Sequence, residues 1–151
     1  MTASVSSLPP MSKANALLFS LVSAGALAGA LVACGPPHRD VPAADVPKLT
    51  SLEQLMDSQA TIADPQMKKA GAASYADADY AAFTEVAERI SATSTKAKEF
   101  SKGPEFDKLA DRLHETAVSL GKAAAAKDQK GSSDALGAMK ATCKECHSKF
   151  K

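Results

Sequence analysis

The chain has 151 residues, and its 18 lysines and arginines against 17 aspartates and glutamates argue against nucleic-acid binding, which needs a clustered excess of positive charge. Aromatic residues make up only 5% of the chain, and with the alanine-rich stretch 123–126 this composition disfavours a β-sandwich or barrel and predicts an all-α protein. The three cysteines lie at positions 34, 143 and 146, which indicates two separate roles.

Residues 1–33 have the composition of a secretory signal peptide. Lys13 is the single charged side chain, and an apolar run follows from 14 to 33. The segment Leu31-Val32-Ala33-Cys34 resembles the lipobox of bacterial lipoproteins, in which the signal is cut before the cysteine and that cysteine is acylated. The resemblance implies a lipid on Cys34 and a periplasmic, membrane-anchored protein.

Two alternatives to the lipoprotein signal stay open. About 20 apolar residues can span a bilayer, so the segment is also compatible with an uncleaved transmembrane anchor, and plain secretion is the other alternative. All of them place the rest of the chain outside the cytoplasm. Met11 lies just ahead of Lys13 and is a second candidate for the translation start.

Residues 34–50 are predicted to be a tether between the lipidated cysteine and a folded domain. They contain Gly35 and four prolines, at positions 36, 37, 42 and 47. This composition stays extended and does not pack.

The first of four amphipathic helices is predicted over 51–63. Thr50 and Ser51 are followed three residues later by Glu53 and Gln54, which makes two overlapping capping boxes. Asp64-Pro65 is expected to end the helix, because the residue before a proline avoids the α conformation. Residues 65–70 are long enough to add one separate turn.

Three further helices follow. The second is predicted over 77–101 and is the longest; the third begins at Pro104, after the break at Gly103. A polar turn at 127–133 supplies a serine cap for the last helix, which runs to the chain end. The apolar positions repeat at three and four residues: Leu52, Leu55, Met56, Gln59, Ile62; Tyr80, Phe83, Val86, Ala87, Ile90, Ala97, Phe100; Phe106, Leu109, Ala110, Leu113, Ala117, Leu120; Leu136, Met139, Cys143, Cys146, His147, Phe150.

These segments predict one domain over 51–151, an antiparallel four-helix bundle of up-down-up-down topology, because short loops make consecutive helices antiparallel neighbours. Core packing alone accounts for the apolar stripes of the first three helices. The stripe of the last helix contains residues that carry chemistry.

Cys143-Lys144-Glu145-Cys146-His147 is the C-x-x-C-H signature of covalent c-type haem attachment. Two thiols three residues apart reach the two vinyl groups of one porphyrin, and the adjacent histidine reaches the iron. Positions 143, 146 and 147 share one helical face. A zinc site would need a fourth ligand that this neighbourhood lacks, and a redox-active pair belongs at a strand-to-helix junction.

The position of this motif at the end of an alanine-rich four-helix chain resembles the class II c-type cytochromes, the cytochrome c prime family. The resemblance covers about 50–151. It implies one haem c per chain, with thioether bonds to Cys143 and Cys146 and with His147 as axial iron ligand. Family members differ on the other face of the iron, which is open to gases in some and bound by a methionine in others.

Met56 is the candidate sixth ligand, since it lies on the apolar stripe of the first helix where the family places its distal residue. Ordinary core packing is the alternative role for Met56. Met67 follows the helix-breaking Pro65 and is a weaker candidate. His114 lies at the edge of the third stripe and is expected at the rim of the bundle.

Charge is distributed unevenly over the predicted domain. Residues 51–95 hold three basic and seven acidic side chains, whereas residues 96–151 hold twelve and eight. The haem helix carries Lys140, Lys144, Lys149 and Lys151 near its end. This collar would steer an acidic redox partner to the haem edge; a merely solvated lysine face that complements the helix dipole is the alternative.

The sequence therefore predicts a periplasmic one-electron carrier that is not an enzyme. The alternative function is a high-spin haem protein that binds nitric oxide or carbon monoxide. Peroxide chemistry is disfavoured, because no distal acid–base pair is evident beside the iron. The expected partners are other redox proteins and, through the lipid, the membrane. The resemblance also makes a homodimer through the first two helices an expectation.

Overall fold

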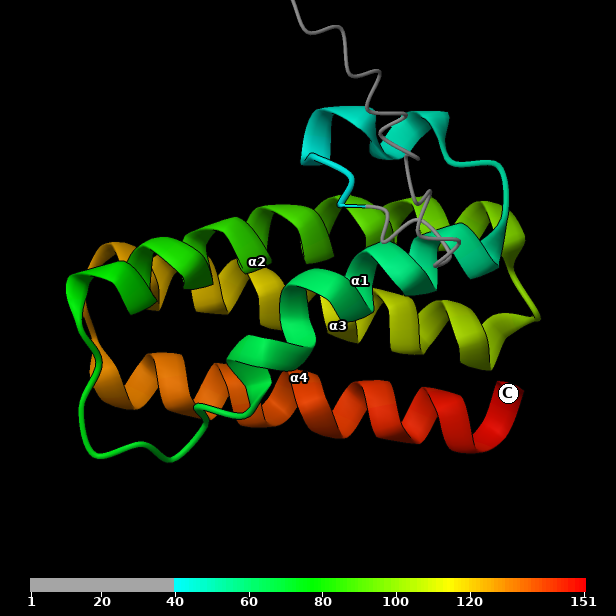
Figure 1. The fold of residues 1–151 in the computed structure, drawn as a ribbon. Coiled ribbons are helices and arrows are strands. Elements are labelled where there is room, and N and C mark those ends of the chain that lie inside the picture. Colours follow the sequence, from blue (N-terminus) through cyan, green and yellow to red (C-terminus); the bar gives the residue numbers. More distant parts are fainter. Residues whose placement is uncertain (1–39) are drawn as a thin grey trace, which may run out of the picture. The chain divides into compact units, whose positions relative to one another are not determined.

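A computed structural model describes residues 40–151 (Figure 1). The predicted signal peptide and Cys34 lie outside the described residues. Within the described part the structure is helical, without strands, and contains four long helices and two short 3-10 helices. They are η1 (Ala43–Lys48), α1 (Leu52–Met67), α2 (Asp77–Ala97), η2 (Lys98–Phe100), α3 (Pro104–Ala125) and α4 (Gln129–Phe150).

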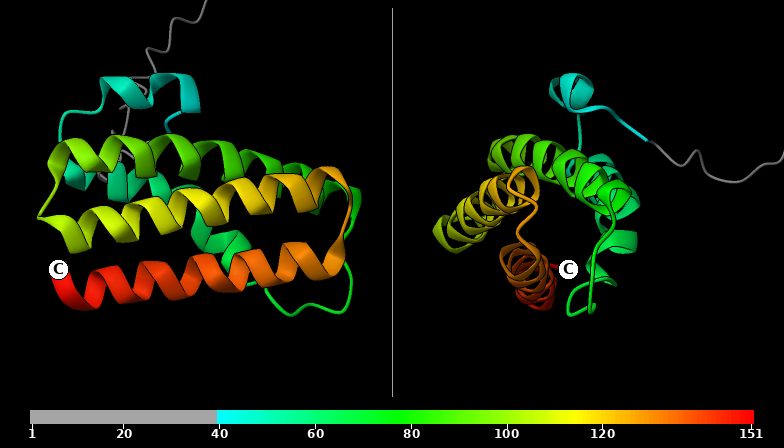
Figure 2. Two further views of the ribbon diagram at one scale, coloured as in Figure 1. Left: turned by 180° about the vertical axis from the view of Figure 1, so that it is seen from behind. Right: turned by 90° about the vertical axis from the view of Figure 1, so that its left-hand side faces the viewer.

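The four long helices form the predicted all-α bundle. α2 packs extensively against α3, and α3 packs against α4, whereas the contact between α1 and α4 is the least extensive of the four neighbouring pairs. Figure 2 shows the bundle from behind and along its length, with η1 outside it beside α2. None of the helices within residues 40–151 combines the length and the apolarity needed to cross a membrane.

The prediction that α1 ends before Pro65 is wrong, because the helix continues to Met67. Pro65 has no N–H, so the carbonyl of Thr61 lacks its usual partner and the helix bends. The apolar stripe nevertheless continues past the proline: Ala63 and Met67 are buried in the main core, and their burial offsets the lost hydrogen bond. Figure 1 shows the last turns of α1 descending toward α4.

The ends of α1 and α2 are held by local polar contacts. Ser51 is the N-cap of α1 and accepts a hydrogen bond from the backbone N–H of Gln54. The Gln54 side chain accepts one from the N–H of Thr50. Of the two predicted capping boxes, the pair Ser51 and Gln54 therefore caps the helix, with the return bond going to Thr50 in place of Ser51. At α2, Asp79 accepts the backbone N–H of Ala76.

The break before α3 is where the sequence predicts it, at Gly103, whose φ of 115° suits a residue without a Cβ. The start of α4 is different from the prediction. The helix begins at Gln129, and its N-cap is Asp128, whose side chain accepts from the N–H of Gly131. Asp128 is an equally good cap and lies earlier in the chain, so it adds a turn to the helix that the serine prediction omitted.

The tether prediction is wrong for residues 43–49, because they fold onto the bundle. η1 packs against α2, with Val46 only 1% exposed and Leu49 also buried. Both belong to an apolar cluster with Leu55 of α1 and Phe106 of α3. The prolines shape this segment without preventing it from packing, since Pro47 lies inside the 3-10 helix.

Arg89 of α2 ties the start of the described chain to the bundle. This side chain is nearly buried and pairs with Asp40 and, at 2.5 Å, with Glu85 of its own helix. Burial disfavours the charged guanidinium, but the hydrogen bonds that it donates to the two carboxylates outweigh this effect, so the pKa of Arg89 is raised above its ordinary value. The contacts of the folded domain therefore include residue 40, well before the predicted start at residue 51.

The interior divides into two apolar clusters. The larger includes Phe83, Ile90, Leu120, Leu136 and Met139, and Cys143 packs against it. The smaller is the cluster that contains Val46, and Cys146 packs against that one. The two thiols of the sequence motif therefore lie on either side of the boundary between the clusters.

We expect Val46→Ala to lower the free energy of unfolding by about 1–3 kcal/mol, because it removes buried methyl groups that join η1 to the bundle. Urea unfolding followed by circular dichroism measures this. Ala44→Ser, at an exposed position of the same 3-10 helix, is the control and should change little. Equal stability of Val46→Ala and the parent chain would mean that η1 contributes nothing to the fold.

Candidate functional site

The C-x-x-C-H residues lie in the last two turns of α4, on the side of the helix that faces α1. Cys143 and Cys146 are half-buried free thiols, and His147 is exposed. The helix is unbroken to Phe150, where the ring packs edge-on against Phe106 of α3 with their centroids 5.4 Å apart. Positions 143, 146 and 147 therefore lie on one face of a continuous helix, as predicted.

A hollow lies between this face of α4 and the helix α1. Three cavities share Met56 and His147 in their linings, and they have volumes of about 510, 40 and 540 Å³. The first is lined by Cys143, the third by Cys146, and the small one by both thiols. The two large cavities fall in the range of sites for small molecules and cofactors. The loose pairing of α1 with α4 leaves this space.

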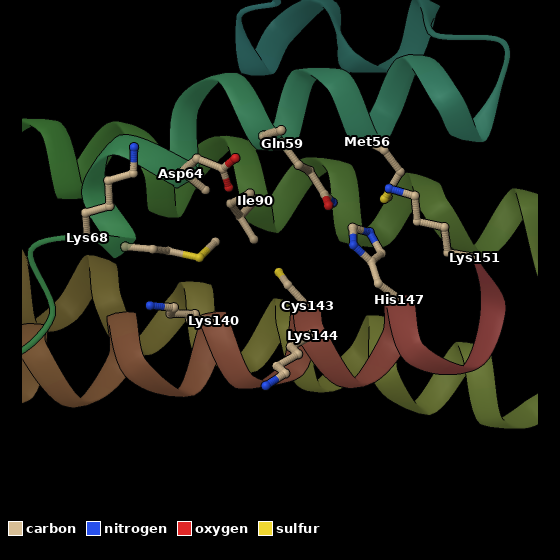
Figure 3. A pocket seen from close by; sticks show the side chains of 13 residues that line it. Met56, Gln59, Asp64, Lys68, Ile90, Lys140, Cys143, Lys144, His147 and Lys151 are labelled. Carbon is tan, nitrogen blue, oxygen red and sulfur yellow. The ribbon is translucent and has the colours of Figure 1, made fainter.

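The structure brings Met56 and His147 to the same hollow from opposite helices. Figure 3 shows the Met56 side chain pointing from α1 toward α4, with the imidazole of His147 below it. Met67 lines only the 510 Å³ cavity, where it is buried. His114 lines none of the three cavities; its ring lies between α2 and α3, with Nδ1 3.1 Å from the Ser91 hydroxyl.

One polar residue of the hollow was not identified as a site residue from the sequence. Gln59 interrupts the apolar stripe of α1, one turn after Met56, and its side chain points into the space above α4 (Figure 3). A polar residue at a core position of an otherwise apolar stripe was the available signal. The stripe alone did not show that this position faces a hollow.

Burial controls the chemistry of the two thiols. It raises the pKa of Cys143 to about 11, and the neighbouring Cys146 and the Asp64 carboxylate act in the same direction. Burial also raises the pKa of Cys146. Both thiols are therefore protonated near neutral pH and are not poised as nucleophiles or redox thiolates.

Lysines surround the mouth of the 510 Å³ cavity. Its lining includes Lys68, Lys140, Lys144 and Lys151, with Asp64 as the one acidic residue. Among the described residues, none of these four lysines makes an ion pair, although most other lysines do. This group of lysines differs from the predicted collar in two respects. Lys149 is not part of it, because it pairs with Glu105 and Glu145. Lys68 of α1 belongs to it instead.

The described residues contain no cluster of side chains that could bind a metal ion without a cofactor. Within residues 40–151, no three histidine, cysteine, aspartate or glutamate side chains come together in a way that could hold a metal ion. Two thiols beside one imidazole, next to an apolar hollow, instead fit a bulky apolar group that brings its own metal.

Comparison with known proteins decides the family. A model of the family Cytochrome C' matches residues 48–151, which is more than two thirds of the chain. The chain belongs to the cytochrome c′ family. Searches of curated proteins and of solved structures return no match.

Membership of this family implies haem c binding, and the chain has the four-helix fold of the family. The residues present fit that cofactor. The hollow lies between two apolar clusters, both thiols line it, and the imidazole and a thioether sulfur line it from opposite helices. A haem bound there supplies one-electron iron chemistry, and the chain supplies its ligands and its access.

We expect Cys143 to be alkylated more slowly than Cys146 in haem-free Cys34→Ser protein at pH 8. The raised pKa leaves little reactive thiolate, and burial restricts access. The rate at Cys143 should rise as the pH approaches 11. Mass spectrometry of iodoacetamide-treated peptides measures both sites.

Urea-denatured protein is the control for this experiment, because unfolding should make the two cysteines react alike. Rapid alkylation of Cys143 at pH 8 in the folded protein would contradict the buried, protonated thiol.

Proposed function

We propose that this protein carries single electrons in the periplasm through one covalently bound haem c. Cys143 and Cys146 form the two thioether bonds, and His147 is the axial iron ligand. One observation carries the proposal: both thiols and the imidazole line a hollow whose opposite wall is Met56. A cofactor held from α4 in this way meets a methionine sulfur on its other side.

Met56 is the proposed sixth ligand. It is half-buried, packs against the smaller apolar cluster, and lines the same three cavities as His147. Methionine with histidine is an axial pair that raises the reduction potential of a haem. Six-coordination in both oxidation states also keeps the ligand set unchanged during transfer, which suits an electron carrier.

The unpaired lysines at the cavity mouth support a role with protein partners. Lys68, Lys140, Lys144 and Lys151 give the entrance a local positive charge in a nearly neutral protein. Such a field raises the rate of encounter with an acidic surface and orients it toward the haem edge. The proposed partners are redox proteins with acidic faces.

The proposed setting is the periplasm, with the protein anchored to a membrane as a lipoprotein. The lipobox-like segment ending at Cys34 supports a lipid anchor and export, and export delivers the chain to the compartment where bacteria attach haem c. The protein is proposed not to be an enzyme: the side chain one turn after Met56 on α1 is Gln59, whose amide does not titrate.

Gas binding is the second candidate function. It is favoured if Met56 stays against the apolar cluster on which it packs, because the iron face opposite His147 would then be open to a small molecule. The coordination of Met56 separates the two candidates: a bound sulfur favours electron transfer, and a free one favours gases.

We expect holoprotein made in a host that attaches haem c to show a low-spin optical spectrum, and Met56→Ala to show a high-spin one. The substitution removes the proposed sixth ligand and leaves His147 in place. Spectra of the oxidised and reduced forms measure this, and the mass of the denatured chain reports one haem attached through two cysteines.

Met67→Ala is the matched control, because this second methionine lines the same cavity and should not affect the spin state. A high-spin parent spectrum that shifts with carbon monoxide would favour the gas-binding function. Absence of haem from the purified parent protein would exclude both functions.

We expect Lys140→Gln with Lys144→Gln to slow electron transfer to an acidic partner several-fold at low salt, and to flatten its dependence on ionic strength. Both lysines lack ion pairs at the entrance. Stopped-flow mixing with an acidic redox protein measures the rate. Lys127→Gln, at the far end of the bundle and paired with Asp77, is the control; an equal effect there would show that only net charge matters.

A further inference from the structure

Gln59 is a polar side chain in a position where apolar packing is expected. It lies on α1 between the buried residues Leu55 and Ala63 and is 7% exposed. It nevertheless lines both the 510 Å³ cavity and the small cavity that touches the two thiols. Burying an amide without partners costs free energy, so its retention at this place calls for hydrogen bonds.

Thr93 of α2 supplies one of these bonds. Its Oγ1 lies 3.0 Å from Nε2 of Gln59 and 2.7 Å from the backbone carbonyl oxygen of Arg89, and the threonine is fully buried. A threonine hydroxyl has a single proton, which goes to the carbonyl. Its oxygen must therefore accept from Gln59, and this fixes the nitrogen of the amide toward Thr93.

The carbonyl oxygen Oε1 of Gln59 is left without a partner. No described residue donates a hydrogen bond to it, and the amide tip lies at the hollow (Figure 3). Turning the amide over would make the hydroxyl of Thr93 give up its backbone acceptor. The fixed orientation therefore presents a hydrogen-bond acceptor to whatever occupies the space beside Met56.

We infer that Gln59 determines the ligand specificity of the hollow, with Thr93 as its positioning residue. The acceptor favours small neutral molecules that donate a hydrogen bond, water above all, and disfavours diatomic gases that only accept one. This inference rests on the proposed function, because it assumes a haem iron between Met56 and His147. It adds a residue that acts on the bound molecule without being an iron ligand.

The test compares the reduced carbon monoxide complexes of the parent holoprotein and Gln59→Leu. The negative end of the amide dipole opposes electron donation from iron into carbon monoxide, so its removal should lower the C–O stretching wavenumber in the infrared. Carbon monoxide affinity should rise about 2- to 10-fold, as expected when a hydrogen-bonded water no longer has to be displaced. The same comparison on a Met56→Ala background removes competition from the methionine.

Two threonine variants test the positioning role. Thr93→Val removes the acceptor that holds the amide nitrogen, so the C–O stretch should split into more than one band as the amide adopts both orientations. Thr93→Ser keeps the hydroxyl and should restore the single parent band. Thr61→Val is the matched control, because it removes a hydroxyl from α1 at a position that lines none of the cavities.

Each outcome decides the inference. An unchanged C–O stretch and affinity in Gln59→Leu would overturn it while leaving the proposed function intact. A stretch that rises in Gln59→Leu would show that an N–H faces the ligand, which overturns the acceptor assignment. A parent protein without haem would instead fail the spectral test of the proposed function, and this inference would fail with it.

Discussion

The separation of α1 from α4 is the constraint on which the rest of this structure depends. A four-helix bundle normally closes this seam with interdigitating side chains, because protein interiors are close-packed. Here α1 is held mainly by α2, while its contact with α4 is the least extensive among the neighbouring helices. The hollow can persist because the other three pairs keep the bundle together without it. The two thiols, the imidazole and the Met56 side chain all line this one gap.

The buried polar groups around the gap are neutral, whereas lysines line its exposed entrance. Deep inside, Gln59 and Thr93 are neutral and hydrogen-bonded to each other, and the thiol of Cys143 stays protonated because burial raises its pKa. At the entrance, four exposed lysines make no ion pair with a described carboxylate. A haem has an apolar ring and ionised edge groups, so a dry interior with a cationic rim is chemically complementary to it.

Helical periodicity and the C-x-x-C-H spacing predicted the four helices, the break at Gly103 and the site wall of α4, because these features depend on local sequence. Two other features depended on tertiary contacts. The helix continues past Pro65 because Ala63 and Met67 find a core to enter, and the proline-rich segment folds because Val46 meets Leu55 and Phe106. The role of Gln59 was equally hidden, since its orientation comes from a threonine 34 residues away in the sequence.

The ion pair between Arg89 and Asp40 affects how far the domain could lie from a lipid on Cys34. If the domain began at residue 51, the sixteen residues 35–50 would form a linker with a length of at most about 58 Å. Because Asp40 pairs with Arg89 of α2, a lipid on Cys34 would leave only the five residues between them, at most about 18 Å. For the proposed anchor, this keeps the haem domain close to the bilayer, so a partner would have to approach it there. With the proposed lipid on Cys34, this ion pair would therefore limit the distance between the membrane and the partners that the domain can reach.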